Sequence, residues 1–299
     1  MKKLLLTGGT GFVGRNIKPL LEKQYEVSTL GRNFGNDIRA DISHDIVGLP
    51  DKYDIVLHAA GKAHTFPRTD EEIQEYFDVN HQGTVNLCSA LECCGLPKLF
   101  VFLSSAAVYG LNEGVDIDET CPLRGITPYA QSKIKAEKYL MGWCEEHHVR
   151  LCILRPSLIA GPNPPGNLGS MIKGIASGRY LSIAGGKAKK SVLMVEDIAK
   201  LVPLLEKKGG IYNICSDDQP TFRELETVIC NQLGRIMPMN MPSWVAKCMA
   251  AIGDLLGKKA PFNTNRHIKM TETLTFDNAK AKKELGWVPL SVIENFRIC

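Results

Sequence analysis

Leu4-Leu5-Leu6-Thr7-Gly8-Gly9-Thr10-Gly11-Phe12-Val13-Gly14 joins a short apolar run to a glycine-rich turn, and a helical pattern follows over residues 17–21. A strand, a glycine turn and a helix in this order form a dinucleotide-binding unit, because glycines allow close backbone approach and the helix N-terminus faces a pyrophosphate. The spacing fits G-x-G-x-x-G from Gly9 and G-x-x-G-x-x-G from Gly8. We predict that the site includes Gly8, Gly11, Phe12, Val13 and Gly14.

Further apolar runs of strand length alternate with helical patterns along the chain. They predict strands over Glu26–Leu30, Asp54–Ala60, Lys98–Leu103, Arg150–Leu154 and Ile211–Cys215. This alternation predicts an α/β fold, a Rossmann-type doubly wound parallel sheet. At Gly161-Pro162-Asn163-Pro164-Pro165-Gly166 the alternation pauses. We expect the dinucleotide-binding domain to span 1–160 plus about 190–216, and a smaller C-terminal α/β substrate domain to span about 161–189 and 217–299.

Composition limits the class of protein. Of the 299 residues 44% are hydrophobic and 23% charged, which is typical of a soluble globular protein, and a net charge of +4 is too small to indicate nucleic-acid binding. The ten cysteines form no CxxC pair and no metal-ligand spacing with histidine, so we expect reduced thiols, a cytoplasmic protein and no metal site. The apolar run 4–6 is too short for an export signal, and no stretch is long enough to span a membrane.

One segment of the smaller domain is apolar almost all round. Residues 239–256 predict a helix, and we expect it to be buried in that domain, although a homodimer contact or a peripheral membrane patch would fit the same pattern.

The second strand ends where an NAD enzyme often carries an acid for the adenosine ribose. Here Gly31 takes that place and Arg32 follows, which favours NADP over NAD, with a solvated loop arginine as the alternative. Asp41 and Ile42 follow a further extended stretch and are placed beside the adenine. Ala59 and Ala60 end the third strand and face the cofactor. Candidate groups in the following loop and helix are Lys62, His64 and Asn80, each with a structural alternative: an exposed loop charge or a buried amide bonded to backbone.

Thr127-Pro128-Tyr129-Ala130-Gln131-Ser132-Lys133 predicts the start of a capped helix. Tyr129 and Lys133 then lie one turn apart on one face, and a nearby ammonium lowers the pKa of a phenol toward neutrality. Ser104 and Ser105 leave the carboxyl end of the preceding strand, where ligands bind in open α/β sheets. The polar loop over residues 111–126 is a candidate flap.

Together these motifs resemble the extended short-chain dehydrogenases/reductases of the nucleotide-sugar epimerase and dehydratase family. The resemblance covers most of the chain. It rests on the residues 7–14, His58-Ala59-Ala60, Val79-Asn80-His81-Gln82-Gly83-Thr84, Ser104 to Gly110, Tyr129 with Lys133, Leu154-Arg155-Pro156, and the tail motifs 274–280 and 284–289.

The resemblance implies a role for each matching residue. Tyr129 is the acid/base, Lys133 holds the nicotinamide ribose and lowers the tyrosine pKa, Ser105 is the catalytic serine and Pro156 lies near the carboxamide. The implied reaction is hydride transfer between NAD(P) and C4 of a nucleotide sugar. We therefore expect a 4-epimerase of a UDP-hexose or UDP-N-acetylhexosamine in polysaccharide biosynthesis. The alternatives are an NADPH-dependent 4-keto reductase and, from another class, a redox-sensing cofactor-binding protein.

The chain departs from the family pattern at the substrate side. Ala106 and Ala107 replace the Asp-Glu pair of the dehydratases, which argues against 4,6-dehydration. Ser157 stands where many epimerases carry asparagine, and Lys190 stands where an arginine commonly grips the substrate diphosphate; lysine keeps the charge but loses the bidentate fork. The expected substrate contacts are Ser104, Ser105, Ser157 and Lys190.

Overall fold

The computed structural model describes residues 1–63, 65, 67–256 and 262–298. Its main element is a seven-stranded sheet in the order β11-β7-β5-β4-β1-β2-β3, in which every neighbouring pair is parallel. The strands are β1 (Lys2–Thr7), β2 (Tyr25–Gly31), β3 (Ile38–Arg39), β4 (Ile55–His58), β5 (Leu99–Leu103), β7 (Arg150–Pro156) and β11 (Gly210–Ile214). The doubly wound parallel sheet predicted from the sequence is therefore confirmed.

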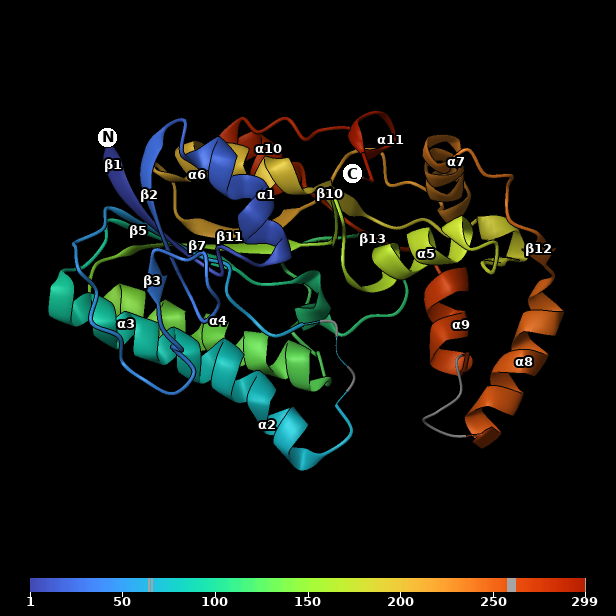
Figure 1. Cartoon of the computed structure of the whole chain (residues 1–299), viewed down its shortest axis with the longest axis horizontal. Helices are drawn as coiled ribbons and strands as arrows, with labels where there is room; N and C mark the ends of the chain where they lie inside the picture. The colour runs from blue at the N-terminus through green and yellow to red at the C-terminus, as the bar shows by residue number, and fades with distance from the viewer. Residues whose placement is uncertain (64, 66, 257–261, 299) are drawn as a thin grey trace.

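Helices cover both faces of this sheet (Figure 1). One face carries α1 (Phe12–Leu21), α6 (Val195–Leu205) and α10 (Ala279–Leu285); the other carries α2 (Asp70–Phe77), α3 (Gly83–Cys94) and α4 (Pro128–Glu146). The alternation of side chains along β1 explains the two cores, because Leu4 and Leu6 enter one and Leu5 enters the other. Residues Asp78–Gln82 form one π-helical turn, η1, between α2 and α3, a feature that is frequent at functional sites.

A smaller lobe lies beside the carboxyl ends of the strands (Figure 1). Its helices are α5 (Gly166–Ala176), α7 (Phe222–Leu233), α8 (Ser243–Leu256), α9 (Thr264–Thr271) and α11 (Val292–Asn295). Three two-stranded pairs accompany them: β8 (Leu158–Ala160) with β10 (Val192–Met194), β9 (Ser182–Ile183) with β12 (Asn240–Met241), and β6 (Gly114–Ile117) with β13 (Leu274–Phe276). Short 3-10 turns lie at η2 (Ala106–Tyr109) and η3 (Ala184–Gly186).

Two segments depart from the expected organisation. Residues 279–287 do not stay with the smaller lobe, because Ala281, Leu285 and Trp287 are buried in the core on the α1 face of the main sheet. A strand at the edge of a parallel sheet still needs cover on its face, and α10 packs against the edge strand β11. The candidate flap over 111–126 is tied down, since β6 within it pairs with β13 from the C-terminal part.

The expectation that residues 239–256 form a buried helix was wrong. Only Ala246, Ala250 and Gly253 of α8 are buried, whereas Trp244 is 71% and Leu255 88% exposed. The helix packs on α9, its buried residues are all small, and its large apolar side chains lie outside, so hydrophobicity alone did not reveal which face is covered. Among the described helices, none is long and apolar enough to cross a membrane.

Candidate functional site

The glycine-rich turn has the geometry that close backbone approach requires. Gly8 has a φ of +74°, and a Cβ there would lie 2.9 Å from the Cα of Ala60. A Cβ at Gly14 would lie 2.2 Å from the carbonyl oxygen of Gly8. The N-cap of α1 is Gly11, which offers no side-chain cap, and the first turn carries no acid, so the helix N-terminus is left for an external anion. The cradle fits a pyrophosphate-bearing cofactor.

A buried histidine fixes the strand ends beside this turn. His58 Nδ1 lies 2.6 Å from Thr7 Oγ1, and His58 Nε2 lies 3.0 Å from Thr84 Oγ1. The amide of Ala60 donates to Thr7 Oγ1 as well. Burial, with a smaller contribution from the Lys133 charge, lowers the pKa of His58 to about 3, so the ring stays neutral. From the sequence, His58 was identified only as part of the motif His58-Ala59-Ala60. A polar residue inside an otherwise apolar strand was the feature that could have indicated its buried role.

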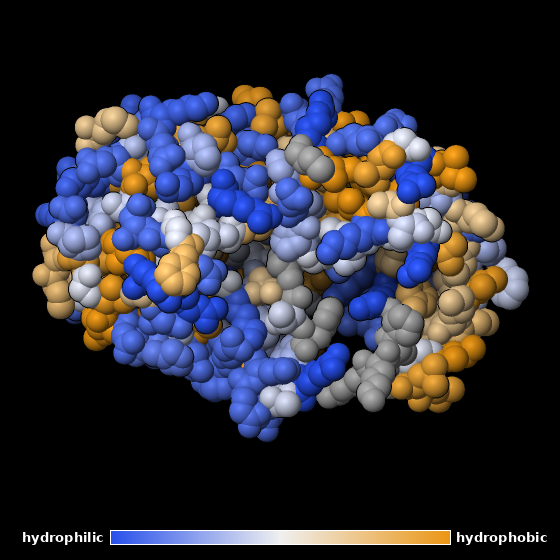
Figure 2. Space-filling model, viewed as in Figure 1, coloured by the Kyte–Doolittle hydropathy of each residue, from blue (hydrophilic) through white to orange (hydrophobic). Residues whose placement is uncertain are grey.

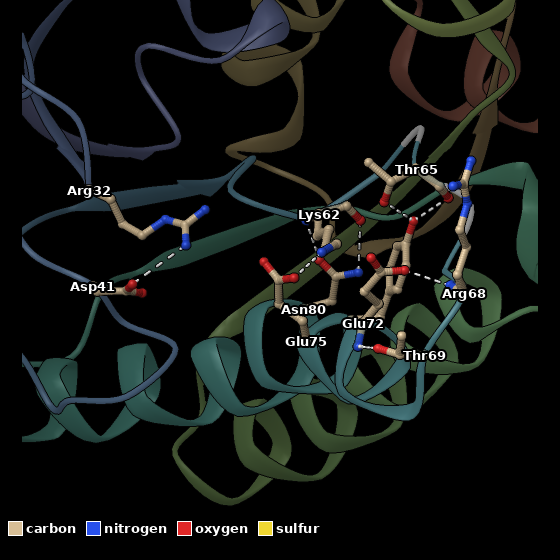
Figure 3. Close-up of polar contacts among 10 residues, drawn as sticks. Arg32, Asp41, Lys62, Thr65, Arg68, Thr69, Glu72, Glu75 and Asn80 are labelled. Atoms are coloured by element: carbon tan, nitrogen blue, oxygen red, sulfur yellow. Dashed lines mark hydrogen bonds and ion pairs between the residues drawn. The ribbon is translucent and has the colours of Figure 1, made fainter.

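Arg32 and Asp41 lie together at the ends of β2 and β3 (Figure 3). Arg32 Nη1 is 3.6 Å from Asp41 Oδ2, and the arginine side chain is 58% exposed. Burial raises the pKa of Asp41, but hydrogen bonds from Ser43 and the Arg32 charge outweigh it, so that the pKa is lowered overall. Gly31 cannot be exchanged for an acid without a shift, since a Cβ there would lie 2.9 Å from the side-chain amide of Asn36. Position 31 thus carries no acid, and Asp41 is the carboxylate that neighbours Arg32.

Ile42, predicted beside the adenine, has its side chain in the core on the α3 face, and its carbonyl accepts a hydrogen bond from Asn86. The Ile42 side chain is buried against the start of α3, because the chain after β3 passes over that helix. Asp41 lies beside Arg32 at the β3 edge of the sheet, where the sequence predicted a carboxylate.

Asn80 lies in the π-helical turn and holds the loop after β4. Its Oδ1 accepts from the amide of Lys62 at 2.7 Å, and its Nδ2 donates to Lys62 O and to Ser132 Oγ. Lys62 was expected to be an exposed loop charge or a ligand contact. Its side chain is only 18% exposed, and its ammonium pairs with Glu75 (Figure 3). The ammonium also lies 5.4 Å from the Tyr76 ring centroid. Asn80 thus connects the backbone of the loop after β4 to helix α4. His64 lies outside the described residues.

The predicted pair Tyr129 and Lys133 occupies one face of α4, close to Ser105. Thr127 caps this helix by accepting from the amide of Ala130 at 3.2 Å, and Pro128 takes its first position, as predicted. Lys133 is buried, and its ammonium donates to Leu103 O at 2.9 Å, so the helix is linked to the end of β5. Burial lowers the pKa of Lys133 to about 8, although Glu137 opposes the shift.

The expected lowering of the tyrosine pKa does not occur in this arrangement. Burial raises the pKa of Tyr129, a hydrogen bond with Ser105 partly offsets that increase, and the neighbouring Tyr76 adds to it. The physical reason is that the phenolate would lose water, while the ammonium of Lys133 is directed to the carbonyl of Leu103. Ser105 is nevertheless brought together with Tyr129, as the sequence predicted.

A buried ion pair, which was not predicted from the sequence, lies beneath the face of α4 that carries Tyr129 and Lys133. Arg155 Nη2 is 2.7 Å from Glu137 Oε2, and both side chains are less than 5% exposed. The hydroxyl of Ser104 donates to Glu137, and Arg155 Nη1 donates to the hydroxyl of Tyr109 at 3.1 Å. Ser104 was predicted to contact substrate, but its buried hydroxyl is used inside this network. Glu137 follows Lys133 by one helical turn, which was the signal available in the sequence.

The remaining predicted residues lie toward the smaller lobe. Pro156 ends β7, and the buried hydroxyl oxygen of Ser157 has no hydrogen-bond partner among the described residues, which suits contact with a bound group. Lys190 donates to Glu272 O at 2.8 Å, and burial lowers its pKa to about 8. Glu272 lines a cavity of about 290 Å³ together with Lys187, Ser243 and Lys247 from η3 and α8. Among the residues described, no cluster of His, Cys, Asp or Glu is arranged to hold a metal ion.

The model of the NAD dependent epimerase/dehydratase family matches residues 4–215, which include the glycine turn, Ser105 and the Tyr129–Lys133 face. The chain belongs to this family. The curated relatives include an N-acetyl-α-D-glucosaminyl-diphospho-ditrans,octacis-undecaprenol 4-epimerase of Escherichia coli O157:H7, which is 30% identical over 93% of this chain and 88% of its own length. A UDP-glucose 4-epimerase of Vibrio cholerae is 28% identical over 98% of this chain and 92% of its own.

Reductases are found among the relatives as well. A GDP-6-deoxy-D-mannose reductase of Pseudomonas aeruginosa is 27% identical over 75% of this chain and 78% of its own. Among solved structures, RMD from Pseudomonas aeruginosa complexed with NADPH has a TM-score of 0.75 at 22% identity and covers 99% of this chain and 96% of its own. This family member is accordingly an enzyme with a Rossmann-type fold.

Proposed function

We propose that this enzyme is an NAD(P)-dependent 4-epimerase of a sugar carried on a diphosphate, such as a UDP-hexose or UDP-N-acetylhexosamine. The observation that carries the proposal is that Ser105, Tyr129 and Lys133 meet at the carboxyl end of β5, beside a glycine turn that fits a dinucleotide. Similarity to two 4-epimerases over more than nine tenths of the chain supports it. The buried, free cysteines of the described chain support a reducing, cytoplasmic setting.

Each residue has a defined task in this reaction. A bound nicotinamide cofactor would supply hydride transfer at C4 of the sugar, where loss and return of hydride on opposite faces inverts the configuration. Tyr129 takes the proton of the C4 hydroxyl as hydride leaves and gives it back afterwards, so the net reaction changes only configuration. Ser105 donates to the same sugar oxygen and holds the keto form. Lys133 holds the nicotinamide ribose, and its charge opposes the effect of burial on the tyrosine once its ammonium turns toward the ribose.

A 4-keto reductase is the second candidate, and one observation favours it. Arg32 presents a half-exposed guanidinium at the ribose end of β2, where Asp41 pairs with it at 3.6 Å and position 31 carries glycine instead of an acid. This arrangement suits the 2′-phosphate of NADPH, which is the usual cofactor of reductions. Ala106 and Ala107 supply no carboxylate, so dehydration is not proposed. A redox sensor is disfavoured because the chain retains the serine, tyrosine and lysine together.

We expect Arg32→Ala to raise the KM for NADPH about tenfold or more while the KM for NADH changes little. Loss of one charge-assisted contact to a phosphate is worth about 1.5–3 kcal/mol, and NADH has no phosphate at that position. Steady-state kinetics with both cofactors measures the ratio of the two changes in KM. Equal changes for both cofactors would remove the proposed NADP preference.

Epimerase and reductase give different products without added reductant. We expect the purified protein to invert C4 in a panel of UDP-hexoses and UDP-N-acetylhexosamines, followed by proton NMR, because an epimerase regenerates its cofactor. Stoichiometric NAD(P)H oxidation with a 4-keto sugar, and no inversion across the panel, would replace the epimerase by the reductase.

The carrier of the sugar diphosphate is open to one alternative. The E. coli relative is named for a sugar linked through a diphosphate to a polyprenol, whereas the V. cholerae relative is named for a uridine nucleotide. Both carriers present the same diphosphate to the enzyme. A lipid carrier is the candidate favoured by the exposed apolar helix α8, since such a substrate stays in a membrane.

A further inference from the structure

Helix α8 carries a continuous apolar stripe that no described residue covers. Trp244, Cys248, Ala251, Ile252 and Leu255 are all exposed and recur at intervals of three or four residues, so they lie along one side of the helix. Leu256 is 70% exposed beside them. Figure 2 shows hydrophobic residues gathered at the edge of the smaller lobe where Figure 1 places α8. Proteins rarely leave contiguous apolar patches of this kind without a binding partner.

The charges around the stripe select the partner. Within the described residues 235–256 and 262–271 the Lys and Arg residues are Arg235, Lys247, Arg266 and Lys269, all exposed, and the only Asp or Glu is Asp254. Asp254 accepts hydrogen bonds from the amide and hydroxyl of Thr264, so its carboxylate serves the start of α9. An apolar stripe with an exposed tryptophan, in a segment whose exposed charges are mainly cationic, is complementary to an anionic bilayer surface.

The same helix borders the cavity whose lining includes Glu272, the residue that Lys190 contacts. Ser243 and Lys247 of α8 line it, each directly preceding a residue of the apolar stripe, Trp244 and Cys248. Lys187, directly after η3, also lines the cavity, and so does Glu272, whose carbonyl accepts a hydrogen bond from Lys190. A diphosphate bound by these lysines would thus lie next to the surface that carries the stripe. A lipid attached to that diphosphate could stay in the bilayer.

We propose that the stripe of α8 seats the enzyme on an anionic lipid bilayer, where it acts on a sugar linked through a diphosphate to a membrane polyprenol. The substrate part rests on the proposed function, while the docking part does not. The enzyme is held at the surface by an amphipathic helix lying in the interface plane. The catalytic groups then lie on the aqueous side of the bilayer surface, and the sugar diphosphate reaches them from the lipid side.

Vesicle binding tests the docking without any turnover. The full chain is mixed with vesicles of phosphatidylcholine, with and without phosphatidylglycerol, and sedimented. We expect wild type to sediment with the anionic vesicles and Ile252→Ser/Leu255→Ser to lose roughly tenfold or more in partitioning. Val288→Ser removes another exposed apolar side chain, outside the stripe, and is expected to bind like wild type. Circular dichroism of each variant checks its fold.

Tryptophan fluorescence locates the contact. Of the three tryptophans Trp143 and Trp287 are at most 5% exposed, so a blue shift on adding vesicles reports on Trp244. Wild type remaining in the supernatant with every vesicle would overturn the docking. So would a homodimer in light scattering that the double substitution converts to a monomer, because the stripe would then join two copies of the chain.

Turnover separates the carrier from the chemistry. With an N-acetylhexosamine linked by diphosphate to a polyprenol in the same vesicles, we expect inversion at C4 by wild type and at least a tenfold slower rate with the double variant. Both proteins are expected to react equally with the substrate dissolved in detergent. Turnover of UDP-sugars but not of the lipid-linked sugar would overturn the lipid carrier alone. Vesicle binding with no turnover of any sugar would instead defeat the proposed function.

Discussion

Tyr129→Phe is expected to lower turnover by about 10²–10⁴-fold, because the phenol hydroxyl is the group that takes and returns the proton. The ring remains, so its edge-on contact with Tyr76, at 6.2 Å between centroids, is kept. Cofactor binding should stay close to that of wild type, since the glycine turn and Lys133 are untouched. Single-turnover rates and cofactor titration by fluorescence measure the two effects separately.

A second tyrosine on the same helix supplies the control. Tyr139 follows Tyr129 by ten residues on α4 and packs against His81, away from Ser105. Tyr139→Phe should therefore retain wild-type turnover. If Tyr129→Phe kept more than a tenth of the activity, another group would have to be the acid/base.

Glu137→Leu is expected to lower the free energy of unfolding by about 3–5 kcal/mol, because it leaves the buried guanidinium of Arg155 without its counter-charge. The substitution also removes the acceptor of the Ser104 hydroxyl. Equilibrium urea denaturation measures the change as a shift of the midpoint. The loss concerns the junction of α4, β5 and β7, directly behind Lys133, so the variant should also bind cofactor more weakly.

An exposed ion pair provides the comparison. Lys18 and Glu22 lie 2.8 Å apart on the surface at the end of α1, and Glu22→Ala should cost at most about 0.5 kcal/mol. A similar destabilisation in both variants would mean that burial of the Glu137–Arg155 pair is not what makes it important.

Local pattern was sufficient for the main sheet and for the face of α4 that carries Tyr129 and Lys133. The glycine turn, the strands and the capped helix with Tyr129 and Lys133 were predicted correctly because each depends on residues that are near in sequence. The same holds for Ser105, since the carboxyl end of a parallel strand is a fixed place in this topology.

Contacts between distant segments decided the rest. Glu137 and Arg155 come from a helix and a strand, and only their packing shows that they form a buried pair that also binds Ser104. Tertiary packing likewise placed α10 in the core of the main sheet, although the sequence had been interpreted as part of the smaller domain there.

The doubly wound sheet, the glycine cradle and the spacing of Tyr129 and Lys133 could be read from local sequence, because backbone geometry and hydrophobic period act locally. The increase in the pKa of Tyr129 on burial and the outward orientation of α8 depend on the folded arrangement. The physical reason is that desolvation and exposure depend on which distant segments cover a side chain, and an apolar run does not specify its cover.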